Sequence, residues 1–547
     1  MQGLMQNVPL LISSLIQHAD RHHGAIEIVS RRVEGDLHRT TYRQLHARAK
    51  QLANALDAWG VGEGQRVATL AWNGHRHMEL YYAVAGKGAI VHTINPRLVP
   101  DQVAWIVNHA EDTCLFFDLT FLPIVEKIAA QLKTVKHFVA MTDRAHMPAS
   151  TSIPELSCYE ELLTAQSTDY IWPVFDENLA SSICYTSGTT GHPKGVLYSH
   201  RSTLLHTFCV TAPDSLSISS TEVILPVVPM FHVNAWGIPY AGAMTGAKLV
   251  FPGAALDGKS VYELIEAEKV TLSAGVPTVW QGLLNYMDQN SLRFSTMRRT
   301  IVGGAALPPA MLRTFEEKYG ITALHAWGMT EMSPIGTVCA LRARHTACSQ
   351  EELYAVKSKQ GRAVYGVDMK IVDHDGNELP WDGKAFGDLY VRGPWTVRKY
   401  FRDEGGDPLV TDAAGQVWFP TGDVATIDAD GYMQITDRSK DVIKSGGEWI
   451  SSIDIENVAV AHPAVAMAAC IGIAHPKWDE RPLLVVVRKP GADLTREVLL
   501  KYYEGRVAKW QMPDDVAFVD SIPMGPTGKM LKNKLREQFR GYKLPGT

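Results

Sequence analysis

Hydrophobic residues along the first part of the chain recur with two different periods. The segment Thr41–Gly60 has apolar residues at helical spacing and ends in glycine, which predicts a helix that buries one face. Arg66–Trp72 and Leu179–Cys184 are short, mostly apolar runs that predict buried strands, and Met78–Gly86 predicts another helix. Because helices and strands alternate, we expect an α/β fold of layered sheets and helices in which the strands run mostly parallel.

The last hundred or so residues follow a different pattern, which begins after the charged stretch Asp437–Lys444. The expected elements are a helix, two strands and a second helix: Asp454–His462, Ala466–Ile473, Leu483–Arg488 and Thr495–Lys509. This order predicts a small α+β unit. Because domain boundaries favour exposed polar stretches, we predict an N-terminal domain over 1–437 and a small, mobile C-terminal lid domain over 438–547.

Composition excludes several classes of protein. The chain has 547 residues, and its 53 basic and 58 acidic residues give a net charge of −5. This balance lacks the basic character of a nucleic-acid-binding protein. No apolar run reaches the ~18 residues that span a bilayer, and the N-terminus lacks the features of a secretory signal. The seven scattered cysteines suit a reducing compartment, so we expect a cytoplasmic protein without a transmembrane segment.

The sequence contains two pairs of closely spaced histidines that could be considered as metal ligands. His22, His23, His75 and His77 have no further metal-ligating residues at suitable spacing around them. We therefore expect all four to be surface residues.

The strongest chemical signal is YTSGTTGHPKGV, which spans Tyr185–Val196 after a predicted strand. Glycines let backbone N–H groups approach a phosphate, hydroxyls add donors, and Lys194 supplies positive charge. The spacing differs from the GxxxxGK[ST] pattern of P-loop enzymes. A flexible surface loop is the alternative, which the density of these residue types disfavours. The predicted phosphate-binding residues are Thr186, Ser187, Gly188, Thr189, Thr190, Gly191 and Lys194.

Four further motifs follow this loop: HAWGMTEMSP (His325–Pro334), FPTGDVATID (Phe419–Asp428), DRSKDVIKSGGEWIS (Asp437–Ser451) and PTGKMLKNKLR (Pro526–Arg536). In this order they resemble the motifs of the adenylate-forming superfamily, and the resemblance covers nearly the whole chain. The segment PMFHVNAWG (Pro229–Gly237) is most similar to the medium- and long-chain fatty-acyl-CoA synthetases and to the related methylmercaptopropionate-CoA ligases.

The resemblance implies how the chain would bind ATP. Thr186 and Glu331 would ligate Mg²⁺, a hard ion that prefers oxygen, and Thr330 would contact the α-phosphate. Lys529 would reach the α-phosphate and the attacking carboxylate as a point charge on a flexible stem. Taken alone, a glutamate after threonine is usually a solvated helix cap, and a lysine after Pro-Thr-Gly is usually a solvated turn residue.

The adenosine contacts follow from the same resemblance. Trp327 stands where most of the superfamily has tyrosine, and its larger ring would stack on the adenine. Asp423 and Arg438 would bind the ribose hydroxyls. The remaining residues expected beside the adenine are Gly328, Gly303, Gly304 and Ala305.

Residues near the predicted domain boundary would serve the second substrate. Lys440 matches the position about which the small domain swings in the superfamily, although an ordinary surface lysine fits the sequence equally well. By resemblance, Lys444 and Trp449 lie on the nucleotide side, whereas the pantetheine arm of coenzyme A would pass three residues: Gly446, Gly447 and Glu448.

The acid would bind near His232, Val233 and Trp236. By resemblance, Trp236 gates an acyl tunnel and His232 lies near the carboxylate. A histidine and a tryptophan in an apolar segment are otherwise more often core residues.

The activity implied is that of an ATP-dependent acid–CoA ligase. It would convert a fatty acid, expected to be of medium chain length, through an acyl-adenylate to acyl-CoA, with AMP and pyrophosphate as products. The catalytic residues would be Lys529, Glu331, Thr186 and His232. A ligase for methylmercaptopropionate or for a short or aryl acid is the alternative, and a non-catalytic acyl- or nucleotide-binding protein is the alternative from another class. Related fatty-acyl enzymes are homodimers, so we expect a homodimer.

Overall fold

A computed structural model of the chain describes residues 1, 3–186, 193–445, 448–525 and 530–545. Within these residues the first large sheet is seven-stranded and mostly parallel. In spatial order its strands are β7 (Ser157–Cys158), β6 (His137–Ala140), β5 (Cys114–Phe117), β3 (Arg66–Leu70), β4 (Ile90–Thr93), β8 (Ala180–Tyr185) and β9 (Gly195–Ser199). The last of these runs antiparallel to β8, so the two form a hairpin.

The second large sheet is nine-stranded over the described residues and parallel at its centre. In spatial order its strands are β16 (Arg362–Ala363), β15 (Ile335–Val338), β14 (Thr322–Gly328), β13 (Arg299–Val302), β12 (Leu272–Gly275), β10 (Val223–Pro226), β11 (Lys248–Phe251), β1 (Glu27–Arg31) and β2 (Leu37–Thr41).

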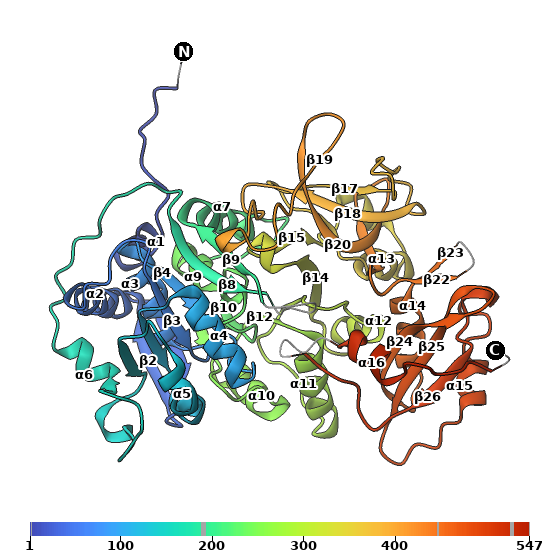
Figure 1. Ribbon diagram of the computed structural model, residues 1–547, viewed down its shortest axis with the longest axis horizontal. Helices are drawn as coiled ribbons and strands as arrows, with labels where there is room; N and C mark the ends of the chain where they lie inside the picture. The colour runs from blue at the N-terminus through green and yellow to red at the C-terminus, as the bar shows by residue number, and fades with distance from the viewer. Residues whose placement is uncertain (2, 187–192, 446–447, 526–529, 546–547) are drawn as a thin grey trace.

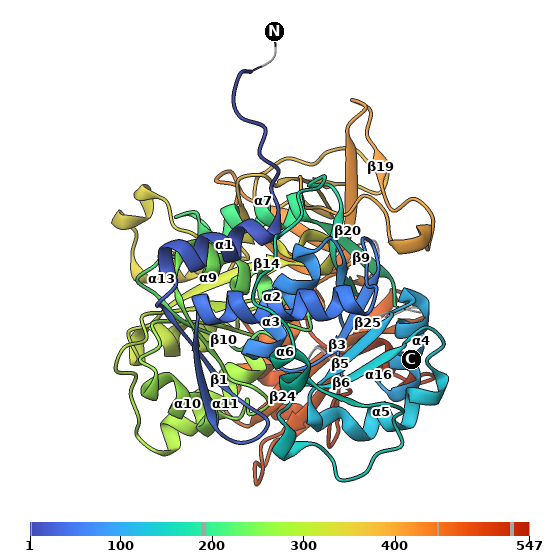
Figure 2. The same ribbon diagram turned by 90° about the vertical axis from the view of Figure 1, so that its left-hand side faces the viewer.

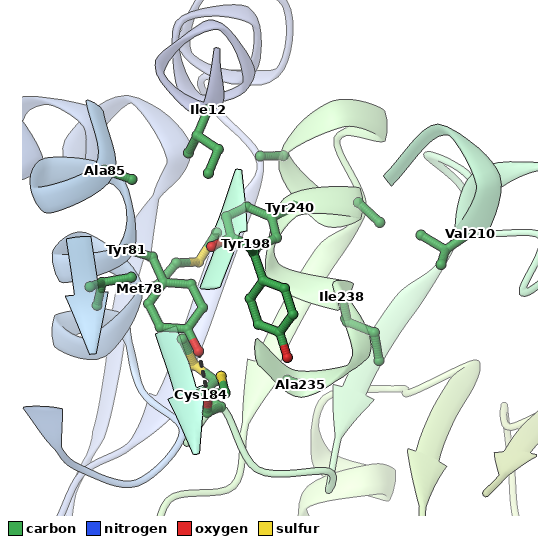
Figure 3. Packing of buried hydrophobic residues seen from close by; sticks show 14 of the residues in the cluster. Ile12, Met78, Tyr81, Ala85, Cys184, Tyr198, Val210, Ala235, Ile238 and Tyr240 are labelled. Carbon is green, nitrogen blue, oxygen red and sulfur yellow. Dashed lines mark hydrogen bonds between the residues drawn. The ribbon is translucent and has the colours of Figure 1, made fainter. Parts of the chain in front are cut away.

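The alternation of side chains along these strands explains the layers. In β3, Val67 faces the cluster between the two sheets and Ala68 faces the opposite side. In the second sheet, Leu249 faces the shared cluster and Val250 the outer one. The helices that contribute to the shared cluster are α1 (Ile12–His23), α2 (Tyr42–Ala58), α3 (His75–Gly86), α6 (Tyr159–Thr164), α7 (His200–Thr211) and α9 (Ile238–Thr245). Figure 3 shows Tyr81, Tyr198 and Tyr240 meeting there.

The outer faces of the sheets carry their own helices. The first sheet is covered by α4 (Pro100–Ala110) and α5 (Leu122–Ile128), and the second by α10 (Gly258–Ala267), α11 (Pro277–Gln289) and α12 (Pro309–Arg313). A further helix, α13 (Gln350–Lys357), precedes β16. Helices therefore cover both faces of each large sheet, as the sequence pattern predicted.

A third, antiparallel sheet lies at the top of the molecule in Figure 1. Its strands are β17 (Asp368–Val372), β18 (Phe386–Arg392), β20 (Val417–Ile427), β19 (Val410–Thr411) and β21 (Met433–Arg438), the last paired with β20. The chain leaves this sheet through β21 and enters the C-terminal unit.

The C-terminal unit forms a separate group of elements in Figure 1. Its sheet consists of β23 (Glu448–Ile450), β22 (Ile443–Ser445), β25 (Asp479–Arg488), β24 (Val465–His475) and β26 (Asp515–Phe518). One face packs on α14 (Ser452–Val460) and α15 (Arg496–Tyr502), and the other on α16 (Lys532–Gln538). The predicted fold class, a large N-terminal domain of layered sheets and helices with a smaller α+β C-terminal domain, is confirmed.

The length of one helix and the exposure of two histidines differ from the expectation. The predicted helix Thr495–Lys509 ends at Tyr502, because the chain turns there and Gly505 has a left-handed φ of 74°. His75 and His77 are buried, not exposed, with 2% and 1% of their surface accessible. They lie on α3, whose surface is covered all round because the helix runs between the two large sheets (Figure 2).

A buried carboxylate on α3 ties this central helix to its neighbours. Glu79 is fully buried and accepts hydrogen bonds from Arg48 Nε at 2.6 Å and from Tyr159 Oη at 2.6 Å. Burial raises the pKa of Glu79, and Arg48 counteracts this effect.

Removing the charged partner should therefore destabilise the fold. Arg48→Met leaves Glu79 buried without its cation, and we expect the free energy of unfolding to fall by about 3 kcal/mol in urea titrations. The control is Arg144→Met, because Arg144 pairs with Glu161 at 3.6 Å where both side chains are mostly exposed. It should change stability little. Equal losses of unfolding free energy for both variants would contradict the stabilising role given to the Arg48–Glu79 pair.

Candidate active site

The phosphate loop begins and ends in the β8–β9 hairpin, where Tyr185 pairs with Gly195. Thr186 N donates to Lys194 O at 2.9 Å, and Lys194 N donates to Thr186 Oγ1 at 3.2 Å. The hairpin therefore fixes both ends of the loop. The predicted residues between them, Ser187, Gly188, Thr189, Thr190 and Gly191, lie outside the described residues.

Glu331 lies just beyond β14, in the short helix η5 (Thr330–Met332). Gly328 permits this turn, because a Cβ there would overlap the carbonyl of Pro334. Tyr198 Oη donates to Thr330 O at 2.7 Å, which ties η5 to the hairpin strand β9. Glu331 itself is only 9% exposed.

Tyr400 connects Glu331 to the phosphate loop. Its hydroxyl donates to Glu331 Oε1 at 2.9 Å, and Lys194 Nζ lies 4.8 Å from the centre of its ring. Burial and the neighbouring carboxylate raise the pKa of Tyr400, so the phenol stays protonated and acts as a donor.

The predicted metal ligands suit Mg²⁺ in their chemistry. Glu331 supplies carboxylate oxygens and Thr186 supplies a hydroxyl oxygen, and oxygen is the donor that this ion prefers. The hydroxyl of Tyr400 engages one carboxylate oxygen of Glu331, as outer partners of metal-binding carboxylates do. The residues present therefore fit the ion.

Three of the predicted adenosine residues form a triad that is joined by a hydrogen bond and an ion pair. Trp327 Nε1 donates to Asp423 Oδ2 at 3.0 Å, and Arg438 Nε pairs with Asp423 Oδ1 at 2.8 Å. They come from β14, β20 and β21 respectively. Both oxygens of a carboxylate that is only 2% exposed are thus engaged, and each retains lone pairs for a further donor.

The glycine segment after β13 lies beside the same strand. A Cβ on Gly303 would lie 3.0 Å from the carbonyl of Ala326 and 3.0 Å from the ring of Trp236. Gly304 has a left-handed φ of 77°, and both Gly304 and Ala305 are exposed. The structure therefore brings Gly303 next to Ala326, the residue before Trp327, and also next to the predicted acyl-site residue Trp236.

Trp236 is carried by α8 (Val233–Trp236), a left-handed turn. Val233, Asn234, Ala235 and Trp236 have φ of 47°, 52°, 49° and 56°. Each such residue costs roughly 1–2 kcal/mol. Hydrogen bonds hold the turn from inside: Asn234 Nδ2 donates to Ser182 Oγ at 3.0 Å, and Asn234 Oδ1 accepts from Tyr81 Oη at 3.3 Å. His232, half-buried, precedes the turn as its N-cap residue.

Several residues predicted near the domain boundary lie on or just before the strands β22 and β23. Lys440 and Lys444 are exposed, and the backbone N–H of Lys444 donates to Glu480 Oε2 at 3.0 Å. The backbone of Trp449 pairs with that of Lys444, and the backbone of Glu448 with that of Ser445. Outside the described part of the chain are Gly446, Gly447, Lys529 and the side chains of Glu448 and Trp449.

A buried polar cluster beside Lys440 was missed by the sequence reasoning. Ser452 N donates to Asp437 Oδ2 at 2.7 Å, and the ammonium of Lys532 contacts Ser452 Oγ and pairs with Glu456 Oε1 at 2.7 Å. Burial raises the pKa of both Asp437 and Glu456, and Lys532 opposes the rise. The sequence places Asp437 at the start of a charged stretch that is expected to be exposed, but its side chain is fully buried.

Tyr400 and Tyr198 were also missed, because neither stands in a motif. Nearby, Gly405 lies against Lys194, because a Cβ on Gly405 would overlap Lys194 Nζ.

Known protein families match most of the chain. A family model described as AMP-binding enzyme matches residues 15–401, and one described as AMP-binding enzyme C-terminal domain matches residues 454–529. Over 540 residues, 99% of each chain, the sequence is 54% identical to a 3-methylmercaptopropionyl-CoA ligase of Ruegeria lacuscaerulensis. It is 50% identical to a medium-chain fatty-acid CoA ligase of Ectopseudomonas oleovorans over 98% of each chain.

A solved anthranilate CoA ligase in complex with anthranoyl-AMP has the same fold, with a TM-score of 0.85 over 98% of this chain and 99% of that one at 23% identity. Among the described residues, no helix has the length and apolar character needed to cross a membrane. The predicted resemblance to the adenylate-forming acyl-CoA synthetases is confirmed: the chain belongs to the AMP-binding enzyme family.

Proposed function

We propose that the protein is an ATP-dependent ligase that joins a medium-chain fatty acid to coenzyme A through an acyl-adenylate and releases AMP and pyrophosphate. The observation that carries the proposal is the triad of Trp327, Asp423 and Arg438, which joins β14 of the nine-stranded sheet to β20 and β21 of the antiparallel sheet. The identity to a medium-chain fatty-acid CoA ligase supports the choice of acid. A methylmercaptopropionate ligase is the second candidate, favoured by the 54% identity to such an enzyme.

The proposed roles follow from the chemistry of each side chain. Trp327 would stack on adenine, Asp423 and Arg438 would bind the ribose, and Thr330 would contact the α-phosphate. Mg²⁺ bound by Glu331 and Thr186 would supply positive charge beside the phosphates. Lys194 and the phosphate loop would hold the pyrophosphate group with fixed donors, which stabilise negative charge that builds up during transfer. Lys529 would approach the α-phosphate when the acid attacks.

We also propose that the small domain, 438–547, turns about Lys440 between the two half-reactions. Asp437 and Ser452 stand on opposite sides of this position and are joined by a hydrogen bond of 2.7 Å. Rotation about Lys440 would separate them, so the buried cluster around Asp437 would favour the arrangement described here. We place the enzyme in the cytoplasm and expect a homodimer.

The test of the function is a panel of acids. Acetate, octanoate, palmitate, methylmercaptopropionate and benzoate are supplied with ATP and Mg²⁺, and AMP release is measured with and without coenzyme A. We expect CoA-dependent AMP release, fastest with octanoate. A maximum with methylmercaptopropionate selects the second candidate, and no release with any acid contradicts the ligase proposal.

The contact between Gly405 and Lys194 can be tested with a matched pair of substitutions. Both Gly405 and Gly406 have left-handed φ, of 80° and 74°, so alanine strains either position. Only at Gly405 would the new Cβ overlap Lys194 Nζ, because nothing lies within 4 Å at Gly406. We expect Gly405→Ala to raise KM for ATP several-fold more than Gly406→Ala in the pyrophosphate-release assay. Equal effects would show that Lys194 does not contribute to ATP binding.

Trp236→Ala should change the preference among acids more than the affinity for ATP. A large side chain that borders an apolar site discriminates by ~1–3 kcal/mol per methylene-sized contact. The acid panel is repeated with this variant, and KM for ATP is determined beside it. Because Trp236 also touches Gly303, an unchanged acid preference with a sharply raised KM for ATP would assign it to the adenine side instead.

Lys529 and Lys440 should separate the two half-reactions. Lys529→Ala is expected to abolish pyrophosphate release from acid and ATP, yet spare acyl-CoA formation from synthetic acyl-AMP. Lys440→Pro fixes φ near −65°. It should leave pyrophosphate release unchanged and slow acyl-CoA formation, because the small domain can no longer rotate about this position. If each variant damages both steps equally, two alternating domain positions are not used.

A further inference from the structure

The segment that leads to Tyr400 is bonded along the turn that carries Glu331. Val397 N donates to Glu331 O at 2.7 Å, and Ser333 Oγ donates to Trp395 O at 3.1 Å. Trp395 Nε1 in turn donates to Ile335 O at 3.0 Å. The backbone on which Glu331 stands is therefore held by its neighbour, residues 395–400, and not by η5 alone.

Tyr400 ends this segment and contacts two charged groups of the site at once. Its hydroxyl donates to Glu331 Oε1 at 2.9 Å, and its ring lies beside the Lys194 ammonium, 4.8 Å from centroid to Nζ. The hydrogen bond fixes the rotation of the carboxylate, and the ring attracts the ammonium through its negative face. One side chain thus sets the relative position of an anion and a cation.

The segment beyond Tyr400 is anchored at a third place, the end of α4. Arg402 Nη2 pairs with Glu111 Oε1 at 2.6 Å, and His109 Nε2 pairs with Glu404 Oε1 at 2.8 Å. The other nitrogen of His109 lies 2.6 Å from the hydroxyl of Tyr185, the residue before Thr186. Anchored on both sides, Tyr400 has little freedom to move away from Glu331.

We propose that Tyr400 is a positioning residue for the metal site: its hydroxyl orients the Glu331 carboxylate for a divalent cation bound with ATP, and its ring holds the Lys194 ammonium. This inference rests on the proposed role of Glu331 as a metal ligand. It assigns Tyr400 a role in how strongly Mg²⁺ promotes ATP binding, which is separate from the choice of acid and from the movement of the small domain.

The test measures ATP binding by calorimetry without any acid, so that no reaction occurs, once with Mg²⁺ and once with EDTA. The ratio of the two dissociation constants is the gain in ATP affinity that Mg²⁺ provides. Tyr400→Phe keeps the ring but removes the hydroxyl, and we expect it to reduce this gain about tenfold, as loss of an outer partner typically does. Binding in EDTA should stay at the wild-type value.

Tyr400→Leu removes the ring as well, so it should also weaken ATP binding in EDTA, because Lys194 loses its support. The control is Tyr82→Phe, whose buried hydroxyl donates to the backbone carbonyl of Pro239 at 3.0 Å. It should leave both dissociation constants unchanged. Thermal unfolding of each variant shows whether the fold is retained.

A double substitution tests the proposed mechanism directly. In a Glu331→Gln background the gain from Mg²⁺ should already be lost, and adding Tyr400→Phe should change nothing further. Two results would overturn the inference. The first is a further loss of the Mg²⁺-dependent gain in ATP affinity when Tyr400→Phe is added to Glu331→Gln. The second is a Tyr400→Phe single variant that keeps the wild-type gain. The proposed ligase activity is judged separately by CoA-dependent AMP release from the wild-type enzyme, and it can stand when the role of Tyr400 fails.

Discussion

The need to partner the buried Asp423 carboxylate links three parts of the structure. A charge with 2% exposure requires compensation, and Asp423 on β20 obtains it from Trp327 on β14 and from Arg438 on β21. Of these strands, β14 belongs to the nine-stranded sheet, and β20 and β21 belong to the antiparallel sheet. The chain continues from β21 into the C-terminal unit. The buried charge of Asp423 thus links β14, an inner strand of the large sheet, to the strand from which the small domain departs.

A single segment also connects the elements around the proposed phosphate site. Residues 395–404 touch the Glu331 turn, Lys194 and the end of α4, three regions far apart in sequence. The left-handed turn of α8 is maintained in a similar way. Buried hydrogen bonds of Asn234, donated to Ser182 and accepted from Tyr81, hold a backbone conformation that the residues of the turn disfavour. Such strain persists only where the surrounding structure over-determines it, and here it sets Trp236 against Gly303.

The polar cluster at Asp437 also ties the helix α16 to the rest of the C-terminal unit. Lys532, three positions after Lys529, is buried against Glu456, and Arg536 on the same helix pairs with Asp441 at 2.7 Å. The helix α16 that follows Lys529 is therefore tied to Asp441 and Glu456, which both follow Lys440 in the chain. In the proposed mechanism, a change of domain position and the withdrawal of Lys529 would be a single movement.

The sequence by itself determined the layered α/β fold, the small C-terminal unit and the family, because hydrophobic periodicity and glycine-rich motifs are local properties of the chain. It also marked Trp327, Glu331 and Asp423, whose neighbours in sequence form recognisable motifs. Only the tertiary structure decided that Trp327 donates to Asp423, that Tyr400 links Glu331 to Lys194, and that His75, His77 and Asp437 are buried. The physical reason is that burial and partner choice depend on which elements pack together, and residues distant in sequence, such as Lys194 and Tyr400, leave no common pattern along the chain.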